Sequence, residues 1–300
     1  MNFADLHCDT PFELFKNKAD IINNQLHISI DKCKIFDHYI QIAAIWCDQS
    51  RNNESCYMDF YSILDYFKQQ ASEYIRYKKE DMKKKEIISF IIAVEDARLL
   101  NNKLKRIKLL YRSGVRFITL TWKNTSCIGG AWNSNFGLTD FGKNAVIEMF
   151  QIGIIPDVSH GSKQLIKDVY DISKKIHKPF CATHSNSFSI YPSRRNLTDE
   201  CARMIADSGG LIGISFCPCH LSENASVQSV INHVDHYLSI VGENAIAFGC
   251  DFDGISSLPR DIYDITSIEK VYWEFCRKFG YRITEKIFYN NTYNFLLNNI

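Results

Sequence analysis

The chain has 300 residues, of which 46% are hydrophobic, and it carries a formal net charge of +1. This composition is typical of a soluble globular protein, and the length suits one large α/β barrel or two smaller domains. The near-zero charge argues against a general affinity for nucleic acid or membrane surfaces, and no apolar run reaches the roughly 20 residues that span a bilayer.

Eleven cysteines, with no signal peptide ahead of the first apolar run, indicate a reducing, cytoplasmic location. Cys47, Cys181 and Cys250 lie within apolar runs, where a free thiol behaves as a small hydrophobic group. Cys217-Pro-Cys219 is a candidate for metal binding or redox chemistry, but no second cysteine pair stands at the spacing of a zinc finger. We therefore expect ordinary thiols at these positions.

Short apolar runs alternate with longer amphipathic ones along the chain, and no Pro/Ser-rich linker divides it. Eight apolar runs are predicted strands: 3–9, 40–47, 87–95, 115–122, 152–159, 179–184, 210–216 and 245–251. Buried parallel strands that each lead into a helix are the pattern of a (β/α)8 barrel. We therefore predict one α/β domain over 1–300, a single TIM-type barrel.

Threonines precede three predicted helices and are expected to cap them: Thr139, Thr198 and Thr266, the last in a Thr-x-x-Glu capping box. The helix after Thr139 should end at Gly153. Two long aromatic-rich runs, 58–85 and 261–279, should pack against the sheet, with the basic residues 83–85 as a solvated helix end. A last helix at 283–298 should close the end of the barrel.

Six residues able to bind a metal stand at the carboxyl ends of five predicted strands. They are His7, Asp9, Glu95, His160, His184 and Asp251. In barrel enzymes the active site is built at this rim. His7 and Asp9 should leave their strand on one face, because side chains alternate along a strand, and Cys8 between them should point the other way.

Three imidazoles and three carboxylates exceed the four positions of one tetrahedral ion. They suit two ions about 3.5 to 4 Å apart that share a carboxylate, and Glu95 is well placed to bridge them. Nitrogen and oxygen ligands without thiolate favour zinc, with manganese, cobalt or iron as alternatives.

The order of these motifs resembles that of the membrane (renal) dipeptidases and their bacterial relatives. The matching motifs are His7-x-Asp9-Thr-Pro, Val-Glu95-Asp-Ala, Leu-Thr-Trp122, Asp-Val-Ser-His160, Thr-His184-Ser-Asn, Arg194-Arg195-Asn-Leu-Thr-Asp, and His233-Val-Asp-His236 running on to Phe-Gly-Cys-Asp251-Phe-Asp-Gly. Members of that family are binuclear zinc hydrolases on an amidohydrolase-type barrel.

The resemblance implies two metal sites that share Glu95. One would use His7 and Asp9 with Asp251 nearby, and the other would use His160 and His184. The resemblance also selects Asp251 over Asp253.

The resemblance further implies a role for an arginine in binding the substrate. It selects Arg195 over Arg194 as the residue that receives the carboxylate of the dipeptide, and His160 is expected beside the substrate. His233 and His236 match a helical motif away from the metals.

The chemistry expected of such a site is hydrolysis by hydroxide, because two Lewis acids lower the pKa of a shared water toward about 7. Asp251 would act as general base and then general acid, with Glu95 as the bridging carboxylate. One metal would stabilise the oxyanion. Arg195, paired with the terminal carboxylate in a bidentate manner, would restrict cleavage to dipeptides.

Three positions depart from the family pattern. Trp122 stands where the animal enzymes carry a histidine that holds the substrate carbonyl, Lys123 where bacterial relatives often have asparagine, and Cys217 where tyrosine is usual. Trp122 is still expected to contact the substrate. These changes bear on oxyanion stabilisation and on the shape of the pocket.

The sequence therefore predicts a zinc dipeptidase that also accepts a D-residue at the C-terminal position, and by analogy a homodimer. Two alternatives remain open: a related metal-dependent barrel hydrolase of another small amide or lactam, and a non-catalytic peptide-binding barrel. Retention of all six candidate ligands argues against the last of these.

Overall fold

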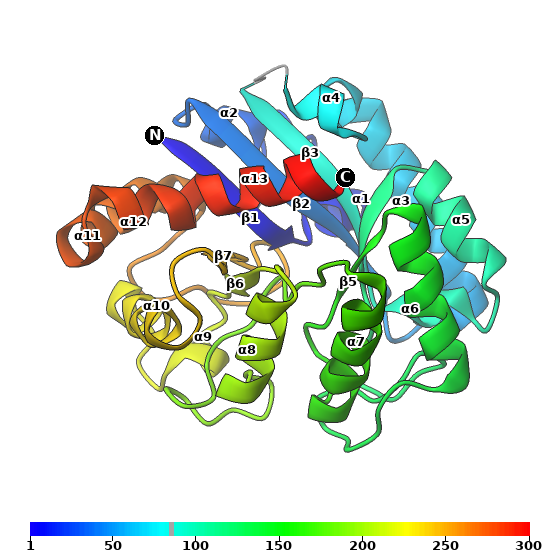
Figure 1. Ribbon diagram of the computed structural model, residues 1–300. Helices are drawn as coiled ribbons and strands as arrows, with labels where there is room; N and C mark the ends of the chain where they lie inside the picture. Colours follow the sequence, from blue (N-terminus) through cyan, green and yellow to red (C-terminus); the bar gives the residue numbers. More distant parts are fainter. Residues whose placement is uncertain (84–86) are drawn as a thin grey trace.

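The computed structural model describes residues 1–83 and 87–300 (Figure 1). Its centre is a seven-stranded parallel sheet in the order β5-β4-β3-β2-β1-β7-β6. The strands are β1 (Asn2–Cys8), β2 (His38–Trp46), β3 (Ile88–Glu95), β4 (Val115–Thr119), β5 (Ile155–Asp157), β6 (Ile212–Ile214) and β7 (Ile246–Phe248).

The sheet closes into a barrel through an irregular segment between β5 and β6. Cys181 forms a parallel bridge to Asp157 in β5, and Ala182 forms one to β6. The next two backbone N–H groups donate to side chains, Thr183 to Asp157 Oδ1 (2.8 Å) and His184 to Ser159 Oγ (3.1 Å). Because these two N–H groups bond to side chains and do not pair with a neighbouring strand, the prediction of a regular strand over 179–184 is wrong. The predicted α/β barrel is confirmed.

The barrel interior is filled by apolar side chains from every part of the wall. They are Ala4, Leu6, Ile40, Ile42, Ala44, Ile91, Ala93, Phe117, Ile155, Cys181, Leu211 and Ala247. Alternate residues of a strand face the same side, so Trp46, Glu95, Thr119 and Asp157 continue the inward series at the carboxyl ends of β2 to β5. The barrel wall thus presents polar groups at its carboxyl rim, above an apolar interior.

A bulge in β1 sets the orientation of His7. Asp5 pairs with Gln41 but Cys8 pairs with Ala43, so β1 contains one extra residue relative to β2. The extra residue lets Leu6 and His7 both face the interior, while Cys8 joins the outer core. Asp5 Oδ1 stabilises the bulge by accepting hydrogen bonds from the backbone N–H of Cys250 (2.7 Å) and of His7 (3.4 Å).

Helices cover the outside of the barrel, and a second, larger apolar core lies between them and the strands. The α-helices are α1 (Thr10–Asn17), α2 (Ile30–Cys33), α3 (Asn53–Ala71), α4 (Lys79–Met82), α5 (Lys105–Arg112), α6 (Asp140–Ile152), α7 (Lys163–Ile176), α8 (Asp199–Asp207), α9 (Pro218–Leu221), α10 (Val227–Val241), α11 (Ile268–Phe279), α12 (Tyr281–Glu285) and α13 (Asn291–Asn299). Shorter turns are the 3₁₀ segments η1 (Ser72–Tyr74), η2 (Ala97–Leu100) and η3 (Ile265–Ser267), and the π-helical η4 (Lys286–Asn290).

The last helix closes the amino-terminal end of the barrel, as predicted. Phe295 and Leu296 of α13 pack with the interior residues, and Figure 1 shows α13 crossing β1 and β2. The predicted helix over 283–298 is divided into α12, the π-helical η4 and α13. The opposite rim, at the carboxyl ends of the strands, is left for the polar residues.

Two of the three predicted caps are confirmed. Thr139 and Thr198 accept hydrogen bonds from the first turns of α6 and α8, and α6 ends at Gly153. The capping box at Thr266 is wrong, because Asp264 caps a short 3₁₀ turn there by accepting the backbone N–H of Thr266 (2.9 Å). The long helix α11 then begins at Ile268.

The predicted run 58–85 comprises the end of α3, followed by η1 and α4. Of its basic end, Lys83 directly follows α4, while residues 84 and 85 lie outside the described residues. Among the helices of the described ranges, none combines the length and the hydropathy that crossing a bilayer requires.

Candidate metal centre

The barrel fold brings the six predicted ligands together at its carboxyl rim. The side chains are almost fully buried, with exposed fractions of 1% for His7, 2% for His184 and 4% for Glu95, and 13% for both His160 and Asp251. Six ionisable groups in so small a volume are costly to bury unless their charges are paired.

One half of the cluster surrounds His7. Its Nε2 atom lies 3.4 Å from Asp9 Oδ2, 3.8 Å from Glu95 Oε2 and 3.9 Å from Asp251 Oδ1. These carboxylates come from three different strand ends and converge on one nitrogen. An imidazole with three carboxylates is a donor set suited to a divalent cation.

The other half surrounds the second oxygen of the same glutamate. Glu95 Oε1 lies 3.1 Å from His160 Nε2 and 3.4 Å from His184 Nε2, and these two nitrogens are 2.8 Å apart. The two oxygens of Glu95 therefore face different groups of ligands. This is the arrangement expected of a carboxylate shared between two ions.

The protonation of the cluster also fits a metal. Burial opposes a charge on His7, yet the carboxylates of Glu95, Asp9 and Asp251 raise its pKa to about 10. A protonated His7 thus supplies positive charge that a metal ion would otherwise bring to these carboxylates. Its Nε2 atom and Asp9 Oδ1 are buried without a hydrogen-bond partner among the described residues, so a bound ion would satisfy both.

The two other histidines are neutral, because burial lowers the pKa of His160 and of His184 well below the usual range. A neutral imidazole is the form that binds metals. His184 Nδ1 lies 2.9 Å from Thr183 Oγ1, which in turn donates to Asp157 Oδ2 at 2.6 Å. Because that hydroxyl proton is used on Asp157, His184 donates from Nδ1 and keeps the Nε2 lone pair free.

Backbone conformation at the rim is unusual. His160 and Asp251 both have φ of 65°, in the left-handed region that costs energy for residues with a side chain. Gly254 makes room for the carboxylates, since a Cβ there would lie 2.1 Å from Asp9 Oδ2 and 2.4 Å from Asp251 Oδ1. Such strain is common where a fold must aim side chains at one point.

Neighbouring residues that could compete as ligands are used elsewhere. Asp253 accepts hydrogen bonds from Thr10 Oγ1 and from the backbone N–H of His27, both at 2.6 Å. His233 uses both ring nitrogens, one with the backbone N–H of Ser187 and one with a backbone carbonyl, each at 3.0 Å. His236 contacts Asp199 at 2.8 Å.

Arg195 is a buried cation beside the cluster. It donates to Ser185 Oγ and to the His184 carbonyl oxygen, each at 3.0 Å, while its Nε is buried without a hydrogen-bond partner. Within the described ranges no carboxylate lies at ion-pair distance from it, and Arg194 next to it is exposed. Burial lowers the pKa of Arg195, and the charges of Asp251, Asp157 and Glu95 oppose this without contacting it. A buried guanidinium with no carboxylate in direct contact can receive one from a ligand.

Two cavities meet at the cluster. One, of about 340 Å³, is lined by Asp9, Glu95, Asp251, Trp46 and Trp122 among others. The ring of Trp122 packs between His160 and Trp46, with ring centroids 6.1 Å and 5.2 Å away.

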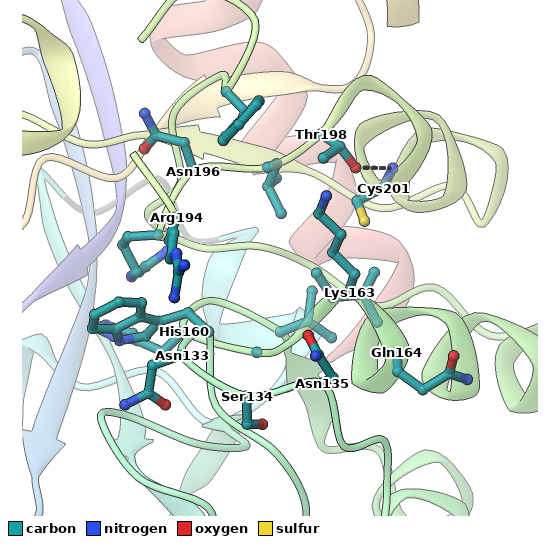
Figure 2. A pocket seen from close by; sticks show the side chains of 17 residues that line it. Asn133, Ser134, Asn135, His160, Lys163, Gln164, Arg194, Asn196, Thr198 and Cys201 are labelled. Atoms are coloured by element: carbon teal, nitrogen blue, oxygen red, sulfur yellow. Dashed lines mark hydrogen bonds between the residues drawn. The ribbon is translucent and has the colours of Figure 1, made fainter. Parts of the chain in front are cut away.

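The other cavity, of about 610 Å³, is lined by both His160 and Arg195 and extends away from the cluster. Figure 2 shows Lys163 and Gln164, from the start of α7, across this cavity from His160 and Arg194. Within the described chain its lining contains no carboxylate. The smaller cavity thus approaches the cluster past carboxylates and aromatic rings, and the larger one past polar and cationic side chains.

Asp157 is the residue of the site that was not predicted. It accepts hydrogen bonds from Thr119 Oγ1, Thr183 Oγ1 and two backbone N–H groups, and so connects β4 and β5 with the irregular segment that contains His184. The only signal in the sequence is a carboxylate inside the apolar run before Ser-His160. Asp96, next to Glu95, caps η2 and accepts a hydrogen bond from Gln49 Nε2 at 2.9 Å.

Fold and site together define a metal-dependent hydrolase on an α/β barrel. A sequence model of the membrane dipeptidase family (peptidase family M19) matches residues 1–296. The chain belongs to this family and is a metallo-dipeptidase.

Several known proteins are similar to this chain in fold or in sequence. The structure of dipeptidase AC, an M19 metallo peptidase, is 24% identical and superposes with a TM-score of 0.90 over 100% of this chain and 98% of that one. A Rhodobacter sphaeroides metallo peptidase, bound to a phosphinate mimic of L-Ala-D-Ala, is 23% identical with a TM-score of 0.89 over 100% and 99%. An uncharacterized Klebsiella pneumoniae protein from the pqqA 5' region is 28% identical over 206 residues, 64% of this chain and 74% of that one.

The contact between Thr183 and His184 predicts how removal of the hydroxyl affects metal affinity. Thr183→Val should weaken metal binding by about 10- to 100-fold, because His184 loses the group that orients its ring. Competition with a chelator of known affinity measures this. Thr292→Val is the matched control, since Thr292 is also buried but its hydroxyl has no partner in the described part of the chain. Equal affinities in the two variants would contradict the role given to Thr183.

Proposed function

We propose that the enzyme holds two zinc ions and hydrolyses dipeptides that have a free terminal carboxylate. The single observation that carries this proposal is the division of Glu95, one oxygen toward His7 and the other toward His160 and His184. The nitrogen and oxygen donors suit zinc, and manganese or cobalt would fit the same ligands. His7 and Asp9, with Asp251 nearby, would hold one ion. His160 and His184 would hold the second.

When bound, the two ions would supply Lewis acidity toward the peptide carbonyl and would acidify a water at the cluster. The protein's own contribution begins with Asp251. Burial raises the pKa of its carboxyl to about 6, with Asp9 adding to the effect. Its side chain is also more exposed to the cavity than that of Glu95 (13% against 4%). It is therefore placed to accept a proton from the attacking water and to pass it to the leaving amine.

Arg195 would fix the substrate from the other side of the cluster. Its free Nε and its position at the start of the larger cavity support pairing with the terminal carboxylate of a dipeptide. The C-terminal residue would then extend into that cavity, and the scissile carbonyl would lie over Glu95. The M19 relative that binds a mimic of L-Ala-D-Ala supports acceptance of a D-residue at this position.

Trp122 would close the smaller cavity above the N-terminal residue of the substrate. Its ring lies between those of His160 and Trp46, tilted against the first and in a T-shaped contact with the second. Its one polar group is the neutral indole N–H. We infer that Trp122 excludes water, and that stabilisation of the oxyanion falls to the ions. The eleven free cysteines support a reducing location, which we take to be the cytoplasm.

Hydrolysis of L-Ala-L-Ala and L-Ala-D-Ala tests the proposal. The wild type should cleave both, should lose activity on chelation and should regain it with zinc. Glu95→Gln should reduce kcat/KM by about a thousandfold or more, because several kcal/mol of transition-state stabilisation depend on the ions. Glu148→Gln, a change in an ion pair with Lys108 on the outer helices, should have no effect.

Cleavage that persists after complete metal removal would contradict the proposal. Two ions per chain without cleavage of any dipeptide would move the assignment to another small amide or a lactam.

The role of Arg195 is tested with paired substrates. Arg195→Met should lower kcat/KM for L-Ala-L-Ala by about a hundredfold, because a charge-assisted pair contributes up to about 3 kcal/mol. Its effect on L-Ala-L-Ala amide, which lacks the carboxylate, should be small. Arg194→Met is the control, since Arg194 is exposed and should affect neither substrate. An equal loss on both substrates would show that Arg195 supports the fold of the site and does not recognise the carboxylate.

A further inference from the structure

A second group of side chains able to bind a metal follows β6. Cys217, Cys219 and His220 stand within four residues, and one ligand atom from each lies within 4.8 Å of the others. The two sulfur atoms are 3.2 Å apart. From the sequence we expected ordinary thiols here, because no second cysteine pair is present. The imidazole of His220 supplies the third ligand that the pair lacks.

The backbone of this segment is held in place by buried polar residues. The carbonyl oxygen of His220 accepts hydrogen bonds from Asn196 Nδ2 (2.8 Å) and Asn186 Nδ2 (3.3 Å). The N–H of Cys217 donates to Ser215 Oγ at 3.1 Å, and the N–H of His220 donates to the Cys217 carbonyl at 3.0 Å. The three ligands are therefore fixed near one another before any ion binds.

The side chains themselves are available for ligation. Burial lowers the pKa of His220 to about 3, with Arg195 adding to the effect, so the ring is neutral. Within the described ranges the His220 ring makes no hydrogen bond. Cys219 is exposed, which gives an ion access from solvent, whereas Cys217 is buried. The three groups thus combine a buried ligand, an exposed ligand and a free imidazole.

We propose that Cys217, Cys219 and His220 form a separate site for one thiophilic divalent ion such as zinc, cadmium or cobalt. Each thiol would release its proton to solvent on binding, and the two thiolates would neutralise the ion. Two sulfurs and one nitrogen fill three of four tetrahedral positions, which leaves one for water. The chemistry differs from that of the Glu95 cluster, whose ligands are nitrogen and oxygen only.

The position of this site connects it to the catalytic cavity. Cys217 and His220 line the same cavity of about 340 Å³ as Asp251 and Trp122. An ion held by all three ligands would lie between them, at the wall of that cavity. The proposal needs no assumption about the substrate, because it concerns binding of the ion alone.

Titration of the metal-free, fully reduced protein with Co²⁺ tests the proposal. Thiolate bound to Co²⁺ gives an intense charge-transfer absorption in the near ultraviolet, which nitrogen and oxygen ligands do not give. The wild type should develop this band and should bind one Co²⁺ more per chain than Cys219→Ser. Cys219→Ser should lack the band but keep the weaker visible bands of the Glu95 cluster. Cys276→Ser, which removes a partly buried thiol on α11, is the matched control and should keep both.

Absence of the near-ultraviolet band from the wild type would overturn the proposal, as would a band of equal intensity in Cys219→Ser. Cys219 is exposed and does not line the catalytic cavity, so circular dichroism of the variant should be that of the wild type. If the dipeptidase proposal failed, dipeptide cleavage would be absent while the charge-transfer band remained. The two proposals therefore fail by different measurements.

Discussion

The structure depends on one buried electrostatic constraint: three carboxylates and three imidazoles share the carboxyl rim of the barrel. Such a cluster is unfavourable on its own, because desolvation of each carboxylate is not compensated by enough positive charge. Protonation of His7 relieves part of the repulsion, and two divalent ions would relieve it fully. Glu95 lies at the centre of this balance because each of its oxygens faces a different set of ligands.

Much of the barrel serves to aim these groups. The bulge held by Asp5 turns His7 inward, and the hydrogen bonds of Asp157 replace regular pairing next to His184. Left-handed backbone at Asp251 directs its carboxylate toward the same point. Each of these features weakens a regular strand or turn locally. The closed barrel and its apolar interior compensate for that cost, which is the usual relation between a site and its scaffold.

Some features of the fold and of the metal site could be predicted from the sequence, and others could not. Glu95 could be placed because it ends a long apolar run, and period-two alternation carries its side chain inward. The inward turn of His7 was not predictable, since the extra residue in β1 is visible only in its pairing with β2. Asp157 was missed because a carboxylate just before a turn is usually a turn former. The regular strand predicted over 179–184 does not form, because the backbone N–H groups of Thr183 and His184 donate to side chains, and the sequence gives no sign of this.

The central claim is that Glu95 joins two ions, and anomalous X-ray diffraction from crystals of the zinc-loaded enzyme tests it most directly. The structure predicts two zinc peaks about 3.5 to 4 Å apart at the carboxyl rim, each with one oxygen of Glu95 as a ligand. A single peak, or two peaks with Glu95 bound to only one of them, would contradict the claim.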